Sequence, residues 1–200
     1  MSFLESIISN LNFGNYPLVS VKSKVDGNTY RVRDLPDKQQ AADLLARVYQ
    51  KIQRFYNYLI ATFPDKPQII QLKQNFKPDP NRLSEATPDA DHTSYSINKG
   101  EAVHLCLRQR NGPDESLVNE NIMFFVSLHE MGHMITKSIG HGPDFWNNFA
   151  WLLKQAEEQG YYRHQNFSAQ PVNYCGVRIT DEPKYDPQKD GAELSIGTLS

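Results

Sequence analysis

The feature that most constrains this 200-residue chain is a stretch around position 128 with apolar side chains at nearly every position of an expected helix. A helix without a polar face belongs inside a domain, so other parts of the chain must cover it. Because 39% of the residues are apolar, the chain can build one core of that kind. We expect the helix from about Val118 to Lys137. Its apolar residues are Ile122, Met123, Phe124, Phe125, Val126, Leu128 and Met131.

Three polar side chains interrupt this helix in the order His129-Glu130-Met-Gly-His133, an H-E-x-x-H pattern. Residues four apart project from the same helix face, so both imidazoles can reach one metal ion while Glu130 is aimed at a water molecule on that ion. Burying these groups costs desolvation free energy, which a metal would offset. The alternative is a metal-free scaffold in which the pattern is accidental and both histidines are hydrogen-bonded core residues.

A catalytic zinc ion takes three protein ligands and keeps a fourth position for water, so one more ligand is needed. His141 is the leading candidate, because Gly140 can turn the chain at the helix end and return the next side chain toward the metal. We therefore predict one Zn²⁺ per chain, bound by His129, His133 and His141. The weaker candidates for the third ligand are Glu157 and Glu158 on the following helix, and His104 and His164, which have no local motif.

The remaining sequence predicts an α+β fold with a small antiparallel or mixed sheet packed on the motif helix and further helices. Turn signals at Asp26-Gly27 and at 98–101 predict two β-hairpins, and apolar residues at helical spacing predict two more long helices. The expected elements are a short N-terminal helix within 3–11, hairpins over 18–32 and 94–108, helices over 36–61 and 143–159, a surface loop over 77–92, and a short strand within 172–179.

These elements predict a single domain over residues 16–180. Residues 1–15 are expected to form an N-terminal arm or short helix that docks on the domain, with a membrane or partner anchor as the alternative. Residues 181–200 are polar and contain proline and glycine, so they predict a flexible C-terminal tail.

Composition and charge argue against several classes of protein. The net charge of −2 argues against a chain whose main task is gripping nucleic-acid phosphates, and no apolar run is long enough to cross a bilayer. The N-terminus has no basic leader typical of a secretory signal. Cys106 and Cys175 are too few for a disulfide framework and suit a reducing compartment, with one disulfide as the alternative. A cytoplasmic or nuclear location is expected, and the oligomeric state stays open.

Two segments of the chain also carry a family resemblance. Leu128-His-Glu-Met-Gly-His-Met134 and Gly140-His-Gly-Pro-Asp-Phe-Trp146 resemble the WLM and SprT-like zincin metallopeptidases. The resemblance is strong over 121–153 and extends more weakly over 94–179. The resemblance implies a zincin-like fold, zinc bound by His129, His133 and His141, and Glu130 as general base. The chain is also similar to WLM-like proteins of large DNA viruses, which implies a viral protein with association with the virion as one option.

Members of the SprT-like group are implicated in cleaving proteins crosslinked to DNA. The present chain departs from that group because it contains two cysteines and no four-cysteine zinc ribbon, and because it has no basic stretch for DNA. Association with nucleic acid therefore stays open.

The pattern as a whole predicts a zinc-dependent endopeptidase acting on a protein or peptide. Glu130 would take a proton from water and deliver it to the leaving amine, while an extended substrate pairs with the edge of the strand over 102–108. The alternative is a zinc-binding structural or interaction protein without protease activity, but an intact Glu130 favours the enzyme. Candidates for stabilising the oxyanion are Tyr161, Tyr162, His164 and Tyr174.

Overall fold

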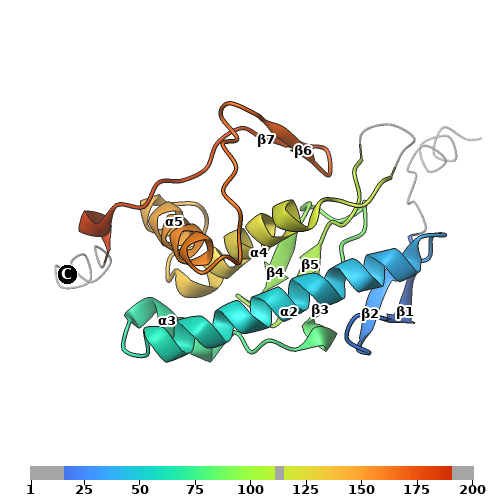
Figure 1. Cartoon of the computed structure of the whole chain (residues 1–200), viewed down its shortest axis with the longest axis horizontal. Coiled ribbons are helices and arrows are strands. Elements are labelled where there is room, and N and C mark those ends of the chain that lie inside the picture. Colours follow the sequence, from blue (N-terminus) through green and yellow to red (C-terminus); the bar gives the residue numbers. More distant parts are fainter. Residues whose placement is uncertain (1–15, 111–114, 191–200) are drawn as a thin grey trace, which may run out of the picture.

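The computed structural model describes residues 16–110 and 115–190, so the predicted N-terminal helix within 3–11 lies outside the described residues. A five-stranded sheet packs against the long helix over 38–62 and the motif helix over 120–135, and two further helices pack on the motif helix (Figure 1). The strands are β1 (Leu18–Lys22), β2 (Thr29–Arg33), β3 (Leu83–Glu85), β4 (Tyr95–Ile97) and β5 (Ala102–Leu105), in the spatial order β1-β2-β3-β5-β4.

The sheet is mixed, which confirms the predicted fold class. The two expected hairpins are antiparallel, β1 with β2 and β4 with β5, whereas β3 runs parallel to both β2 and β5. The prediction that an extended substrate pairs with the edge of the strand over 102–108 is wrong about which strand has a free edge. Because β5 has β3 on one side and β4 on the other, both of its edges are occupied, and among the described residues β4 carries the free edge at that end of the sheet.

The central strand β3 lies inside the segment 77–92, for which a surface loop was predicted, and that prediction is wrong. A 3-10 turn, η1 (Pro80–Arg82), leads into the strand. The sequence Leu-Ser-Glu has no apolar alternation, but all three residues are buried. The carboxylate of Glu85 accepts the backbone N–H of Arg33 at 2.7 Å and the Nε–H of Arg108 at 2.8 Å, which satisfies it inside the protein.

The helices are α2 (Lys38–Thr62), α3 (Pro67–Asn75), α4 (Glu120–Ile135) and α5 (Pro143–Glu158). The structure confirms the expected helices over 36–61, 118–137 and 143–159, and adds α3, which the sequence pattern does not predict. As predicted, α4 is buried nearly all round, because α2, α3 and α5 all pack against it (Figure 1). Within the described ranges, no helix combines the length and the apolar character that crossing a membrane requires.

The chain after α5 forms a second, two-stranded sheet rather than one short strand. Strands β6 (Val172–Tyr174) and β7 (Val177–Ile179) pair antiparallel, and a 3-10 turn, η2 (Pro187–Lys189), follows. A flexible tail was predicted over 181–200, but its described part is anchored: the carboxylate of Asp190 accepts hydrogen bonds from Lys66 Nζ at 2.5 Å and from Gln68 Nε2 at 3.1 Å. The rest of the predicted tail, residues 191–200, lies outside the described residues.

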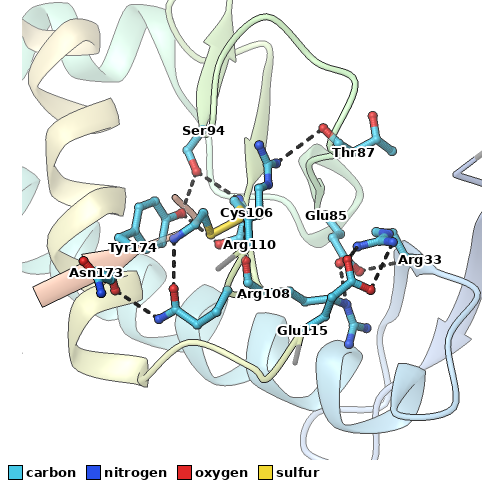
Figure 2. Close-up of a disulfide and its surroundings, with 12 residues drawn as sticks. Arg33, Glu85, Thr87, Ser94, Cys106, Arg108, Arg110, Glu115, Asn173 and Tyr174 are labelled. Atoms are coloured by element: carbon cyan, nitrogen blue, oxygen red, sulfur yellow. Dashed lines mark hydrogen bonds and ion pairs between the residues drawn. A yellow bond between two sulfur atoms is a disulfide. The ribbon is translucent and has the colours of Figure 1, made fainter. Parts of the chain in front are cut away.

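A disulfide joins Cys106, which follows β5, to Cys175 in the turn between β6 and β7 (Figure 2). Free thiols were the first expectation, and the structure has the alternative, one disulfide. The adjacent Tyr174 hydroxyl lies 2.7 Å from Ser94 Oγ and donates to the carbonyl of Cys106 at 2.8 Å. The small hairpin is therefore fixed to the end of the main sheet where β4 begins.

Candidate metal centre

The structure brings three histidines together. His129 and His133 lie one turn apart on α4, and His141 lies in the loop between α4 and α5. One nitrogen of each ring lies within 4.8 Å of the others, and Nε2 of His129 is 3.1 Å from Nε2 of His141. Over residues 16–110 and 115–190, this is the one set of three side chains placed to share a metal ion.

The loop geometry explains how His141 reaches the helix. Gly140 adopts φ +87°, the left-handed conformation that reverses the chain after α4. Pro143 then starts α5, which packs very closely on α4 at Gly132: a Cβ atom there would lie 3.0 Å from the ring of Phe145. The glycine within the H-E-x-x-H pattern thus allows α5, and with it the loop, to lie directly against the two motif histidines.

A single phenyl ring backs all three imidazoles. Phe145 is fully buried, and its ring centroid lies 5.0 Å from that of His129, 4.3 Å from that of His133 and 4.8 Å from that of His141. The neighbouring Trp146 stacks on His141 at 5.5 Å. The sequence predicts a helix over 143–159 that contains both aromatic residues, but it does not predict their contact with the site. The available signal was their position directly after His141-Gly-Pro.

Glu130 lies beside His129 and is almost entirely buried, with 4% of the residue exposed. Its Oε1 is 3.3 Å from Nδ1 of His129. An Nδ1–H that donates to this carboxylate leaves the lone pair of His129 on Nε2, the atom that faces His141. Glu130 also lines the cleft into which the three histidines open.

Two of the three histidines, His133 and His141, are in surroundings that favour the neutral imidazole. Burial lowers the pKa of His133 to about 4, with a further contribution from neighbouring His129, and burial also lowers the pKa of His141. Neutral imidazole is the form that binds a metal ion. With Zn–N bonds of roughly 2.0–2.1 Å, two nitrogens of a tetrahedral site lie about 3.3 Å apart. The separation of 3.1 Å between His129 and His141 fits that arrangement.

The three histidines open into a cleft of about 410 Å³. Glu130 lies in it, the edge strand β4 contributes Tyr95 and Ser96, and the loop 138–141 forms another part of its lining. The free edge of the sheet therefore borders the candidate metal centre.

The other candidate ligands lie elsewhere. His104 is on β5 and its Nδ1 lies 2.8 Å from Ser84 Oγ. His164 lies between two carboxylates, 3.1 Å from Glu157 and 3.3 Å from Glu182, and Glu158 pairs with Lys154. None of these four side chains belongs to the three-histidine set.

The four side chains predicted as candidates for stabilising the oxyanion do not line the cleft. Tyr161 packs on Phe55, His164 is held by its carboxylates, and Tyr162 and Tyr174 are buried. The tyrosine that does line the cleft is Tyr95, on the edge strand.

Comparison with known proteins places the chain among viral relatives. It is 32% identical over 166 residues to the uncharacterized protein R325 of Acanthamoeba polyphaga mimivirus, which covers 81% of this chain and 82% of that protein. It is 33% identical over 87 residues to the uncharacterized protein 042R of Invertebrate iridescent virus 3, covering 44% of this chain and 52% of that protein.

No family model matches the chain. Among solved structures, the crystal structure of Wss1 from Saccharomyces cerevisiae is similar, with 24% identity and a TM-score of 0.46 over 64% of this chain and 89% of that one. On the strength of the mimivirus alignment, the chain belongs to the same family as protein R325.

Proposed function

We propose that this protein is a zinc-dependent endopeptidase, with His129, His133 and His141 as the metal ligands and Glu130 as the general base. The observation that carries the proposal is the convergence of three imidazoles beside a buried carboxylate, in a cleft open to solvent. A site that only held a metal for structural reasons would need the three ligands but would not need Glu130.

Each residue has a part in the reaction. A zinc ion held by the three histidines would supply Lewis acidity and lower the pKa of water. The Glu130 carboxylate would accept a proton from the attacking water and return that proton to the leaving amine. The low exposure of Glu130 keeps bulk water from competing for this proton transfer.

The free edge of β4 is the place for an extended substrate. Unpaired backbone groups on an edge strand can bind a peptide as an additional strand. Since β4 borders the cleft, a peptide paired with it would run past the three histidines. Tyr95 lines the same cleft and replaces the earlier tyrosine candidates as the side chain to test for oxyanion stabilisation.

The test combines metal content with peptide cleavage. We expect about one zinc per purified chain by elemental analysis, and cleavage of unstructured peptides detected by mass spectrometry. The variant Glu130→Gln should keep the zinc and lose cleavage, because the amide cannot accept the proton. His133→Ala and His141→Ala should lose both.

The matched control for metal binding is His104→Ala, which removes an imidazole outside the three-histidine set and should keep the zinc. The matched control for cleavage is His164→Ala, whose ring lies between Glu157 and Glu182 and does not line the cleft. Full activity in Glu130→Gln would refute the mechanism. Equal zinc loss in His104→Ala and His141→Ala would mean that the third ligand is misassigned. A zinc-loaded protein that cleaves none of the peptides would favour the structural or interaction role.

A further inference from the structure

A second, larger pocket opens directly beside the candidate metal centre. It has a volume of about 680 Å³ and shares His129 with the cleft of the three histidines. Its lining comes from α4, from α5 and from the chain around β7. The apolar residues that line it are Phe125, Trp146, Phe149, Val177 and Ile179.

Two of these side chains carry exposed apolar surface that the core does not require. Trp146 is 43% exposed and Val177 is 50% exposed, whereas Phe125 and Phe149 below them are buried. Large apolar side chains grouped around a concave surface mark a place where another molecule binds.

The wall of the pocket formed by the C-terminal segment is fixed in place. The disulfide at Cys175 attaches the β6–β7 hairpin to the main sheet. Farther along, the side-chain oxygen of Asn147 accepts the backbone N–H of Asp186 at 2.9 Å, and Asp190 is bound by Lys66. A preformed pocket binds its ligand more tightly, because few side chains and backbone segments lose conformational entropy on binding.

We infer that this pocket receives one large apolar side chain, aromatic or long aliphatic, from a residue of the peptide substrate next to the scissile bond. The inference rests on the proposed peptidase function. Successive residues of an extended peptide are about 3.3 Å apart. A carbonyl at the three histidines therefore places a neighbouring side chain within reach of a pocket that begins at His129.

The charges at the pocket explain why an apolar side chain is selected rather than a charged one. The C-terminal segment contributes two carboxylates, Asp181 and Glu182, and two ammonium groups, Lys184 and Lys189. The two negative and two positive charges cancel, so they attract neither a cationic nor an anionic side chain. The pocket therefore selects side chains by apolar contact.

The first arm of the test measures binding without catalysis. The full chain in its metal-free form is titrated with N-acetyl-phenylalaninamide and with N-acetyl-alaninamide, and the two tryptophan indole N–H signals are followed by NMR. We expect the phenylalanine compound to shift the Trp146 signal, to leave that of the internal Trp151 in place, and to bind at least about tenfold more tightly than the alanine compound. Equal binding of the two compounds would overturn the inference.

The second arm uses variants and cleavage. Val177→Arg places a charge at the pocket and should abolish the Trp146 shift, while Ile70→Arg, a similarly exposed site on α3, should not. On zinc-loaded protein, peptides with phenylalanine beside the cleaved bond should have at least about a tenfold higher kcat/KM than their alanine counterparts, and Val177→Arg should remove that preference through KM.

The two arms separate the two proposals. Cleavage without preference for the apolar residue would overturn the pocket assignment and leave the peptidase standing. Absence of cleavage, with selective binding of the phenylalanine compound, would support the pocket as an apolar binding site and refute the peptidase function.

Discussion

At the scale of single residues, Phe145 links the packing of the protein to its candidate chemistry. The ring contacts the core on one side and all three imidazoles on the other. A buried side chain that touches every ligand restricts the orientations that the imidazoles can adopt. Residues behind a metal site act in this way on affinity, because they fix ligand geometry before the metal binds.

We expect Phe145→Leu to weaken zinc affinity by about tenfold while the protein stays folded, which is the lower end of the roughly 10–100-fold loss caused by removing a hydrogen-bonded partner behind a metal ligand. The stability cost should be near the roughly 1.5 kcal/mol expected for an apolar exchange in a core. Zinc affinity is measured by competition with a chromogenic chelator, and stability by urea unfolding of the metal-free protein.

Phe55→Leu is the matched control, since Phe55 is equally buried but lies on α2 and packs on Phe124 and Tyr161. It should lower stability to a similar degree and leave zinc affinity unchanged. If both variants bind zinc as the wild type does, Phe145 is a core residue and nothing more.

At the scale of elements, the short strand β3 depends on a buried charge network rather than on its own sequence. Glu85 is 1% exposed and accepts hydrogen bonds from Arg33 and Arg108, and Arg108 also pairs with Asp37 at the start of α2 (Figure 2 shows Glu85, Arg33 and Arg108). Arg33 pairs in turn with Glu115 at 2.8 Å. These contacts join β2, β3 and the segment after β5.

Glu85→Ala should destabilise the protein by about 3–5 kcal/mol, because it leaves the Arg108 guanidinium buried with one partner fewer. Glu158→Ala removes a carboxylate from an exposed pair with Lys154 and should cost less than about 1 kcal/mol. Chemical denaturation of the two variants provides the comparison. Similar small losses in both would mean that the network adds nothing to the stability of β3.

The same network shows what the sequence can and cannot predict. The H-E-x-x-H helix, the long helix α2 and the two hairpins follow from periodicity and turn residues that lie close together in the chain. Strand β3 does not, because its three residues gain their pairing from β2 and β5, which are distant in sequence. Helix α3 was likewise missed, since only Ile69 and Leu72 among its nine residues are buried.

The candidate site divides in the same way. The three histidines and Glu130 are close together in sequence, so local patterns indicated them. The free edge of β4 and the pocket beside His129 depend on how distant elements pack, whereas the contact of Phe145 with the cluster comes from its position four residues after His141. No turn or periodicity signal reports these features.

At the scale of the whole molecule, the disulfide attaches the last described part of the chain to the main sheet. Cys106 and Cys175 are 69 positions apart, so the bond closes a large loop that contains α4, α5 and all three histidines. Closing a loop of this size restricts the unfolded chain and stabilises the folded one, typically by 2–4 kcal/mol. The same bond fixes the β6–β7 hairpin, which forms part of the apolar pocket.

We expect the double variant Cys106→Ala, Cys175→Ala to lose about 2–4 kcal/mol of unfolding free energy and to exchange the amide hydrogens of β6 and β7 much faster than the wild type. The amides of α4 should exchange only as much faster as the global loss of stability dictates, because α2, α3 and α5 hold that helix. Hydrogen exchange followed by mass spectrometry separates the two regions.

A reducing agent should reproduce the effect in the wild type and have none in the variant. If β6 and β7 stay as protected in the variant as in the wild type, Tyr174 and the Gln109 side chain, which hydrogen-bonds the backbone at Asn173 and Cys175, are sufficient to hold the hairpin without the covalent bond.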